Sequence, residues 1–181
     1  ASFYHYFDKA IIFCLDRNYK FQFKSRRINF FYCDTKNIND IKNFENLLAN
    51  KKVELLDIII DDASHIYSDI LINFKNFFKK VRSGGFYVIE DFNHYKYYSN
   101  LDDTSSVSLK IEEIFQHLKH KEIFESPILN KDFQHYCFNN ILEITIHKGI
   151  QNDSYIAFIK KNNYLNTLFY YSYWLFIYTS L

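Results

Sequence analysis

Short, continuously apolar runs that end in acidic residues are the feature that most constrains how this chain can fold. Their length and their β-branched and aromatic content favour strands that are buried on both faces of a sheet. Buried strands of this kind are typical of parallel sheets whose faces are covered by helices. The predicted strands cover residues 10–15, 28–33, 53–60 and 86–89.

Between these runs, apolar residues recur at helical spacing. Residues 37–50 form one amphipathic pattern, and a second begins at a cap on Ser68 or Asp69 and ends at the pair Gly84-Gly85. Strands alternating with helices predict an α/β fold, with a Rossmann-like, mostly parallel sheet and helices on both faces.

The second half of the chain is predicted to complete this sheet. Residues 93–106 are polar and tyrosine-rich and are predicted to form a loop, whereas residues 107–118 carry another amphipathic helical pattern. Pro127 interrupts the chain, and the runs 141–146 and 155–159 favour a C-terminal antiparallel strand pair.

Acidic residues close the four successive strands of the predicted sheet. In parallel sheets, ligands bind beyond the carboxyl ends of the strands. Single acids at such ends are often helix caps or solvated loop residues, but a set this large predicts a cleft lined with carboxylates. The residues are Asp16, Asp34, Asp61, Asp62, Glu90 and Asp91.

The acids after the third and fourth strands have the chemistry of a metal site. Adjacent strand residues point to opposite sides, so Asp61 and Asp62 diverge, whereas Asp62 and His65 are close enough in sequence to converge. Carboxylates that meet Glu90 and Asp91 there would raise one another's pKa unless a divalent cation, most simply Mg²⁺, lies between them.

The single histidine beside these acids suits a different role. His65 would be a poor ligand for Mg²⁺ but a good general base near neutral pH. The combination fits the deprotonation of a hydroxyl held on a metal. The other histidines, His94 among them, show no partner spacing and are predicted to be surface or core residues.

Composition limits the partners of the chain. The 181 residues carry a net charge of +1 with both signs mixed, so no basic face for nucleic acid is expected. The three cysteines are too few for a disulfide framework and favour a reducing, cytoplasmic location.

The end of the chain differs from the rest. Residues 1–161 follow the α/β pattern, whereas residues 162–181 form an apolar, aromatic tail that we expect to lie outside the core. The apolar run 168–181 is shorter than the ~18–20 residues of a membrane-spanning helix. Contact with a membrane interface, coverage of a partner and out-of-frame translation are alternatives, and we do not favour membrane contact.

The stretch from Asp57 to Phe92 resembles a known family. The segments "DIIIDDASH" and "GGFYVIEDF", joined by a helix with paired aromatics, are similar to the class I S-adenosylmethionine-dependent methyltransferases. They are most similar to the metal-dependent O-methyltransferases that modify macrolides and sugars, a mycinamicin-type group that includes sequences described as rhamnosyl O-methyltransferase or cephalosporin hydroxylase.

The resemblance implies a role for each acid of the third and fourth strands. Asp62, Glu90 and Asp91 match the Mg²⁺ ligands of the family, and His65 matches the base that removes the hydroxyl proton. The acceptor would be a hydroxyl of a sugar or of a glycosylated small molecule.

The resemblance also implies a site for S-adenosylmethionine. Asp16 matches the acid that holds the cofactor ribose, Asp34 would lie by the adenine, and Asp61 is a weaker candidate near the methionine part. The same residues leave two alternatives open: a metal-dependent hydrolase or oxygenase, and a non-catalytic remnant of a methyltransferase.

Two departures from the family pattern stand out. Ala63 replaces the usual glycine, which matters only if the backbone there needs a positive φ. The first strand of the family and its glycine-rich loop would precede Ala1, so we expect a truncated domain whose sheet has a gap between the second and fourth family strands.

Overall fold

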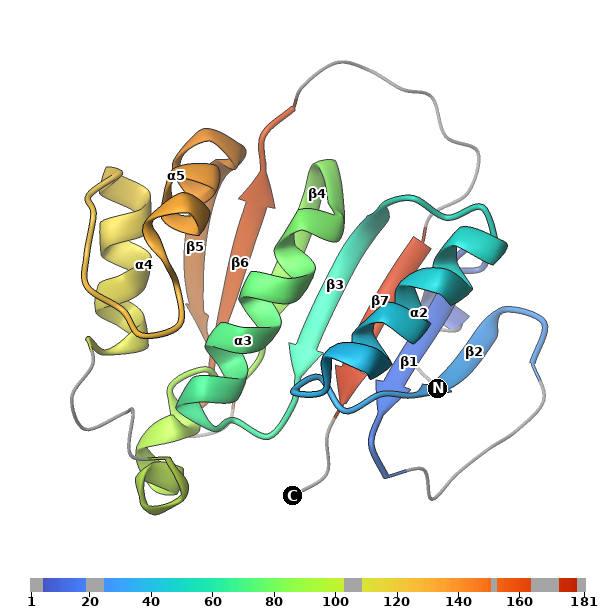
Figure 1. Ribbon diagram of the computed structural model, residues 1–181, viewed down its shortest axis with the longest axis horizontal. Helices are drawn as coiled ribbons and strands as arrows, with labels where there is room; N and C mark the ends of the chain where they lie inside the picture. The colour runs from blue at the N-terminus through green and yellow to red at the C-terminus, as the bar shows by residue number, and fades with distance from the viewer. Residues whose placement is uncertain (1–4, 19–24, 103–108, 151–152, 164–172, 179–181) are drawn as a thin grey trace.

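The computed structural model describes residues 5–18, 25–102, 109–150, 153–163 and 173–178. These residues form a seven-stranded sheet in the order β2-β1-β7-β3-β4-β6-β5 (Figure 1). The strands are β1 (Ile11–Asp16), β2 (Ile28–Tyr32), β3 (Leu56–Asp62), β4 (Val81–Ile89), β5 (Ile141–Lys148), β6 (Tyr155–Lys161) and β7 (Tyr173–Tyr178). The helices are α2 (Ile38–Asn50), α3 (Tyr67–Phe77), α4 (Ile111–His120) and α5 (Lys131–Asn140), with short 3₁₀ helices η1 (Phe78–Lys80) and η2 (His94–Leu101).

The sheet is mostly parallel, as the continuously apolar strands predict. β2, β1, β7, β3 and β4 run in one direction, and β6 and β5 close the sheet as an antiparallel pair. The α/β, Rossmann-like fold expected from the sequence is therefore confirmed. Because the five parallel strands share a direction, their carboxyl ends lie along one edge of the sheet.

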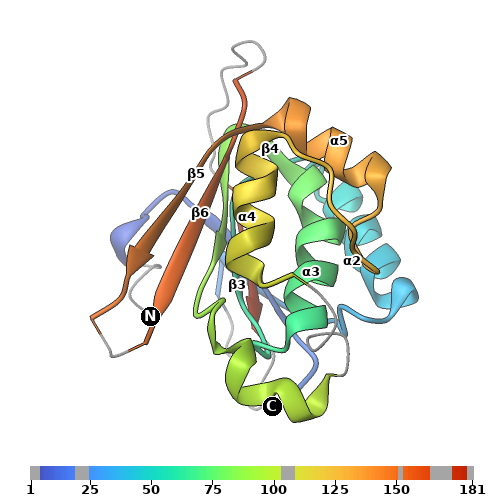
Figure 2. The same ribbon diagram turned by 90° about the vertical axis from the view of Figure 1, so that its left-hand side faces the viewer.

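Helices α2 to α5 all lie on one face of the sheet (Figure 2). Side chains alternate along each strand, so Leu175 and Ile177 join the large core under the helices, whereas Trp174 belongs to a smaller apolar cluster on the other face. That smaller cluster contains Ile12, Ile60 and other strand residues, and no residue of α2 to α5 is part of it. Phe7, directly after the helical residues His5 and Tyr6, packs on Trp174 of this cluster with 3.9 Å between the ring centroids, so helical residues lie against both faces of the sheet, as the sequence predicts.

The position of β7 corrects the prediction for residues 162–181. Residues 173–178 lie in the middle of the sheet, paired in parallel with β1 on one side and β3 on the other. The predicted gap is therefore filled, and the assignment of this segment to a tail outside the core is wrong. Residues 164–172 and 179–181, which complete that tail, lie outside the described residues.

A buried acid ties β7 to its neighbours at the amino end of the strands. Asp57 of β3 accepts a hydrogen bond from the backbone N–H of Tyr173 and forms an ion pair with Arg82 of β4, with 2.6 Å between Nε and Oδ1.

Of the helices built from described residues, none is long and apolar enough to cross a membrane.

Local boundaries also differ from the predictions. α3 begins at Tyr67, and its cap position is Ile66, which makes no capping bond through its side chain. Ser68 and Asp69 lie in the first helical turn instead of at the cap. The predicted loop after β4 contains η2, and α5 has no counterpart in the sequence analysis because its apolar pattern is weak.

The two cysteines in predicted strands behave mostly as expected. Cys33 is fully buried and Cys14 is half-buried, and both are free thiols. Burial raises the pKa of Cys14 to about 11 and that of Cys33 to about 12. Both side chains therefore act as small apolar groups in the sheet.

The central position of β7 predicts a large effect of truncating a core side chain there. Leu175 is fully buried, so Leu175→Ala should lower the free energy of unfolding by about 2–5 kcal/mol, measured by urea denaturation. Leu142→Ala on the edge strand β5, where the side chain is 52% exposed, serves as the control and should change stability little. Equal effects of the two substitutions would contradict a β7 inside the sheet.

Candidate functional site

The carboxyl edge of the parallel strands gathers the acids that the sequence analysis singled out. Asp16 ends β1, Asp62 ends β3, and Glu90 follows directly after β4. In the register of β3 and β4, Asp61 lies beside Ile89, and the N–H of Glu90 donates to the backbone carbonyl of Asp61 at 2.9 Å. This register places Asp62 next to Glu90 at the end of two hydrogen-bonded strands.

Asp61 points away from this edge, into the core under the helices. It is 1% exposed, and its carboxylate accepts hydrogen bonds from Asn73 Nδ2 at 3.1 Å and from the Tyr87 hydroxyl at 2.9 Å. Burial raises its pKa to about 7, although both hydrogen bonds act in the opposite direction. Both oxygens are thus engaged inside the protein, and this arrangement does not favour Asp61 as a cofactor ligand.

Asp62 points to the opposite side and meets His65. Its Oδ1 lies 3.7 Å from His65 Nε2, and the two side chains are 38% and 18% exposed. Burial raises the pKa of Asp62, with the Asp91 carboxylate adding to the shift and His65 opposing it. The convergence of Asp62 and His65 across the turn, expected from the sequence, is confirmed.

Glu90 and Asp91 complete a cluster of like charges. Burial raises the pKa of Glu90, and the neighbouring carboxylates of Asp62 and Asp91 raise it further. The same surroundings lower the pKa of His65, because burial disfavours the imidazolium more than the adjacent carboxylates favour it. His65 is therefore held as a neutral imidazole that can accept a proton.

A second histidine, which the sequence analysis assigned to the surface or core, lies in this cluster. The His94 ring is 5.8 Å from the His65 ring, and its Nδ1 is 3.8 Å from Asp91 Oδ2. Its Nε2 lies 3.0 Å from the backbone carbonyl of Asp153. The signal that could have revealed it is the spacing of Asp91 and His94, which repeats the three-residue separation of Asp62 and His65.

The backbone adopts unusual conformations at two residues of the cluster. His65 has φ 56° and Asp91 has φ 48°, both in the left-handed region that costs a residue with a Cβ about 1–2 kcal/mol. Conformations of this kind concentrate at functional sites. Ala63 has no positive φ, so the backbone there does not require the glycine of the family pattern.

The donor set of the cluster has the chemistry of a hard-cation site. Asp62, Glu90 and Asp91 supply oxygen ligands, and Asp91 Oδ1 is buried without a hydrogen-bond partner among the described residues. In the part of the chain that the structure describes, however, no group of three or more histidine, cysteine, aspartate or glutamate side chains is placed so that it could hold a metal ion. Binding of Mg²⁺ would thus require these side chains to rotate toward one another.

The two acids expected to bind the cofactor lie at the same edge, further along the sheet. Asp16 Oδ1 accepts from the Asn18 N–H at 2.9 Å, and Asp34 Oδ1 accepts from the Lys36 N–H at 3.0 Å. β7 lies between β1 and β3, so Asp16 is two strands away from Asp62. The structure places Asp16 and Asp34 near one end of the edge and the Asp62–His65 cluster near its centre.

An apolar groove reaches the cluster from the sheet face that α2 to α5 leave open. Its volume is about 350 Å³, and Glu90 is its single charged lining residue. The apolar part of its wall comes from β3, β4, β6, β7 and the segment before β1. The lining residues are Phe7, Ile58, Ile60, Phe86, Val88, Glu90, Ile156, Phe158 and Trp174.

Comparison with known proteins confirms the resemblance to O-methyltransferases that the sequence predicts. No protein-family model matches the chain. Demethylmacrocin O-methyltransferase from Streptomyces fradiae is 37% identical over 87 residues, which make up 48% of this chain and 21% of that protein.

Solved structures of a methyltransferase share the fold. MycE methyltransferase from the mycinamycin biosynthetic pathway, in complex with Mg, SAH and mycinamycin VI, has a TM-score of 0.56 and 25% identity over 83% of this chain and 36% of its own. A second structure of MycE, with Mg and SAH, has a TM-score of 0.55 and 24% identity over 83% of this chain and 37% of its own. The chain thus spans about a fifth of the curated relative and little more than a third of the solved structures.

The burial of Glu90 beside two other carboxylates predicts that removing its charge stabilises the fold. Because the pKa of Glu90 is raised in the folded chain, its ionised form is disfavoured there, and this cost is present at pH 7 and disappears as the pH falls toward 4. With a chelator present, Glu90→Gln should raise the free energy of unfolding by about 0.2–1 kcal/mol at pH 7, and by less at pH 4.

Glu143→Gln on the exposed side of β5 is the matched control for this substitution. It should leave stability nearly unchanged at both pH values. A loss of stability in Glu90→Gln at pH 7, measured by urea denaturation, would mean that Glu90 is stabilised by its surroundings and that the carboxylates do not repel one another.

Proposed function

We propose that this chain carries the catalytic core of an S-adenosylmethionine-dependent, Mg²⁺-dependent O-methyltransferase. The acceptor would be a hydroxyl of a sugar or of a glycosylated small molecule. The observation that carries the proposal is the gathering of Asp62, Glu90 and Asp91 at the carboxyl edge of β3 and β4, beside His65, where neighbouring carboxylates add to the raised pKa of Asp62 and Glu90. The similarity to demethylmacrocin O-methyltransferase, and to a methyltransferase solved with Mg, SAH and mycinamycin VI, supports the same assignment.

Each residue of the cluster has a distinct part in the proposed reaction. Asp62, Glu90 and Asp91 would hold Mg²⁺, which when bound lowers the pKa of a hydroxyl beside it. His65 accepts the hydroxyl proton while the substrate oxygen takes the methyl group, and S-adenosylhomocysteine is left as the product. The left-handed backbone at His65 supports this assignment, because conformations of this kind concentrate at functional sites.

Asp16 and Asp34 are proposed to hold the cofactor. Both carboxylates lie at the carboxyl ends of neighbouring strands. There Asp16 would accept hydrogen bonds from the ribose hydroxyls, and Asp34 would lie by the adenine. Asp61 is left out of this site because its oxygens are bonded to Asn73 and Tyr87 in the core. The sulfonium of the cofactor activates the methyl group, so the chain mainly supplies position and charge stabilisation.

The acceptor is proposed to be a small molecule with an apolar part. Glu90 lines the apolar groove, so an apolar ligand bound there would lie beside the carboxylates proposed to hold Mg²⁺. A cytoplasmic location and the lack of a nucleic-acid partner stay predictions from the sequence. A metal-dependent hydrolase or oxygenase would use the same acids, but the likeness to methyltransferases favours methyl transfer.

A thermal unfolding experiment with S-adenosylhomocysteine and Mg²⁺ tests this proposal. Each ligand binds only the folded chain, so at about 100 times its dissociation constant it should add about 2.7 kcal/mol of stability and raise the Tm. Asp62→Asn should abolish the rise caused by Mg²⁺ and keep the rise caused by S-adenosylhomocysteine. A chain whose Tm responds to neither ligand would be a non-catalytic remnant.

His65→Ala separates catalysis from binding in the same experiment. This variant should keep both Tm shifts and lose at least ~100-fold in the rate of methyl transfer to mycinamycin VI, since a general base contributes roughly 10²–10⁴-fold. If His65→Ala lost the Tm shifts and kept its rate, His65 would be a binding residue and the assignment of the base would be wrong.

A further inference from the structure

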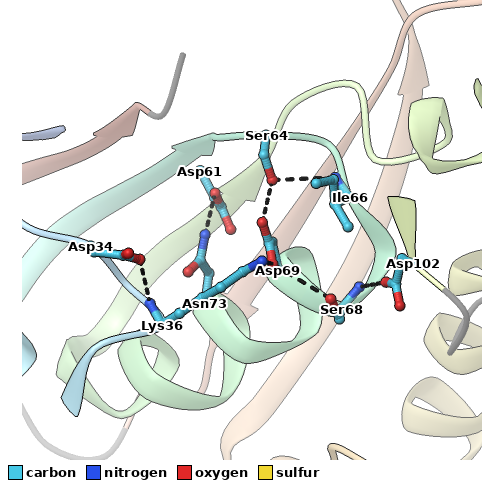
Figure 3. A network of polar contacts seen from close by, with 9 residues as sticks. All are labelled: Asp34, Lys36, Asp61, Ser64, Ile66, Ser68, Asp69, Asn73 and Asp102. Atoms are coloured by element: carbon cyan, nitrogen blue, oxygen red, sulfur yellow. Dashed lines mark hydrogen bonds and ion pairs between the residues drawn. The ribbon is translucent and has the colours of Figure 1, made fainter. Parts of the chain in front are cut away.

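A continuous set of polar contacts connects the loop after β2 with the turn after β3 (Figure 3). At its centre, the Asp69 carboxylate lies 2.7 Å from Lys36 Nζ and accepts a hydrogen bond of 2.6 Å from the Ser64 hydroxyl. Lys36 belongs to the loop after β2, Ser64 to the turn after β3, and Asp69 to the first turn of α3. Asp69 therefore bridges two segments that are far apart in the sequence.

Both ends of this connection reach residues of the proposed site. On one side, the backbone N–H of Lys36 donates to Asp34 Oδ1 at 3.0 Å. On the other side, the N–H of Ile66 lies 3.4 Å from Ser64 Oγ, so the two residues that flank His65 are bonded to each other. His65 itself has φ 56°, a conformation that persists only where its surroundings hold it.

The burial of Asp69 makes this connection energetically necessary. Its side chain is only 7% exposed, whereas that of Lys36 is 45% exposed. A buried carboxylate is costly unless it is paired and hydrogen-bonded, and here Lys36 and Ser64 provide the cation and the donor. The ion pair between Lys36 and the buried Asp69 carboxylate therefore holds the loop after β2 against α3.

We propose that Lys36, Asp69 and Ser64 act as a positioning link that fixes the backbone of His65 and couples it to the loop of Asp34. The link transmits a displacement of the loop after β2 to the turn that bears His65. The role of this link in methyl transfer rests on the proposed function, in which Asp34 lies by the cofactor and His65 acts as the base. The coupling itself is a property of the fold and needs no ligand.

Amide resonances of the ligand-free chain, recorded by ¹H–¹⁵N NMR, test the coupling. Lys36→Met removes the charge at a half-exposed position and should shift the amide resonances of Ser64, His65 and Ile66. The matched control is Lys80→Met, which removes a comparable ion pair of 2.7 Å with Glu45 and should leave those resonances in place. If Lys36→Met does not fold, Asp69→Asn, which keeps an acceptor for Ser64, carries the same comparison.

A double variant tests whether the effect of Lys36→Met reaches His65 through Asp69 and Ser64. In a Ser64→Ala chain the bond to Asp69 is absent, so adding Lys36→Met should no longer shift the resonance of His65. An unshifted His65 in the single variant, or an equal shift in both backgrounds, would overturn the proposal, because Lys36 and Asp69 would then be a structural ion pair alone.

Binding of S-adenosylhomocysteine separates this inference from the proposed function. If the cofactor contacts the Asp34 loop, Lys36→Met should weaken its affinity by about 5-fold or more, and Lys80→Met should not change it. A wild-type chain that does not bind S-adenosylhomocysteine contradicts the proposed function, whereas the resonance of His65 still decides whether the link exists.

Discussion

The parallel pairing of β3 with β4 is the constraint on which the rest of this structure depends. Side chains alternate along a strand, so the register that sets Asp61 beside Ile89 also decides which acids face the core and which face outward. Asp61 is bonded under the helices, while Asp62 points to the other side next to His65. A shift of one residue in this register would exchange their places and leave no cluster at the edge.

Burying a carboxylate costs the fold free energy, and the surroundings of the buried carboxylates differ between the core and the edge of the sheet. In the core, Asp61 is paired with Asn73 and Tyr87, and Asp69 with Ser64 and Lys36, so these carboxylates have hydrogen-bond partners, although burial still raises the pKa of Asp61 to about 7. At the edge, burial and like charges raise the pKa of Asp62 and of Glu90, although His65 opposes the shift of Asp62. Destabilised groups of this kind mark functional sites, because a ligand can supply what the fold does not.

Much of the fold could be predicted from the sequence, since continuously apolar runs and helical spacing report burial directly. The convergence of Asp62 and His65 followed from their spacing across one turn, and the opposed directions of Asp61 and Asp62 followed from strand alternation. The order of strands could not be predicted in the same way. Residues 173–178 are an ordinary buried strand by composition, but only their pairing with β1 and β3 shows that they lie in the centre of the sheet.

Contacts between segments distant in sequence explain the other differences. His94 is held at the cluster by a contact of its Nε2 with the backbone carbonyl of Asp153, 59 positions later in the sequence. Lys36 and Asp69, which form an ion pair, lie 33 positions apart. The cap of α3 was misplaced because Asp69, which has the chemistry of a cap, bonds Ser64 and Lys36 instead. Local preference was outweighed by tertiary contacts in each case.

The central claim is that β3 and β4 bring Asp62, Glu90 and Asp91 together around one hard cation. Paramagnetic broadening of amide resonances by Mn²⁺, used in place of Mg²⁺, measures this directly, because broadening falls steeply with distance from the ion. Strong broadening confined to the amides around Asp62, His65, Glu90 and Asp91, and lost in Glu90→Gln, is the predicted result. Broadening centred elsewhere, or unchanged in Glu90→Gln, would contradict the claim.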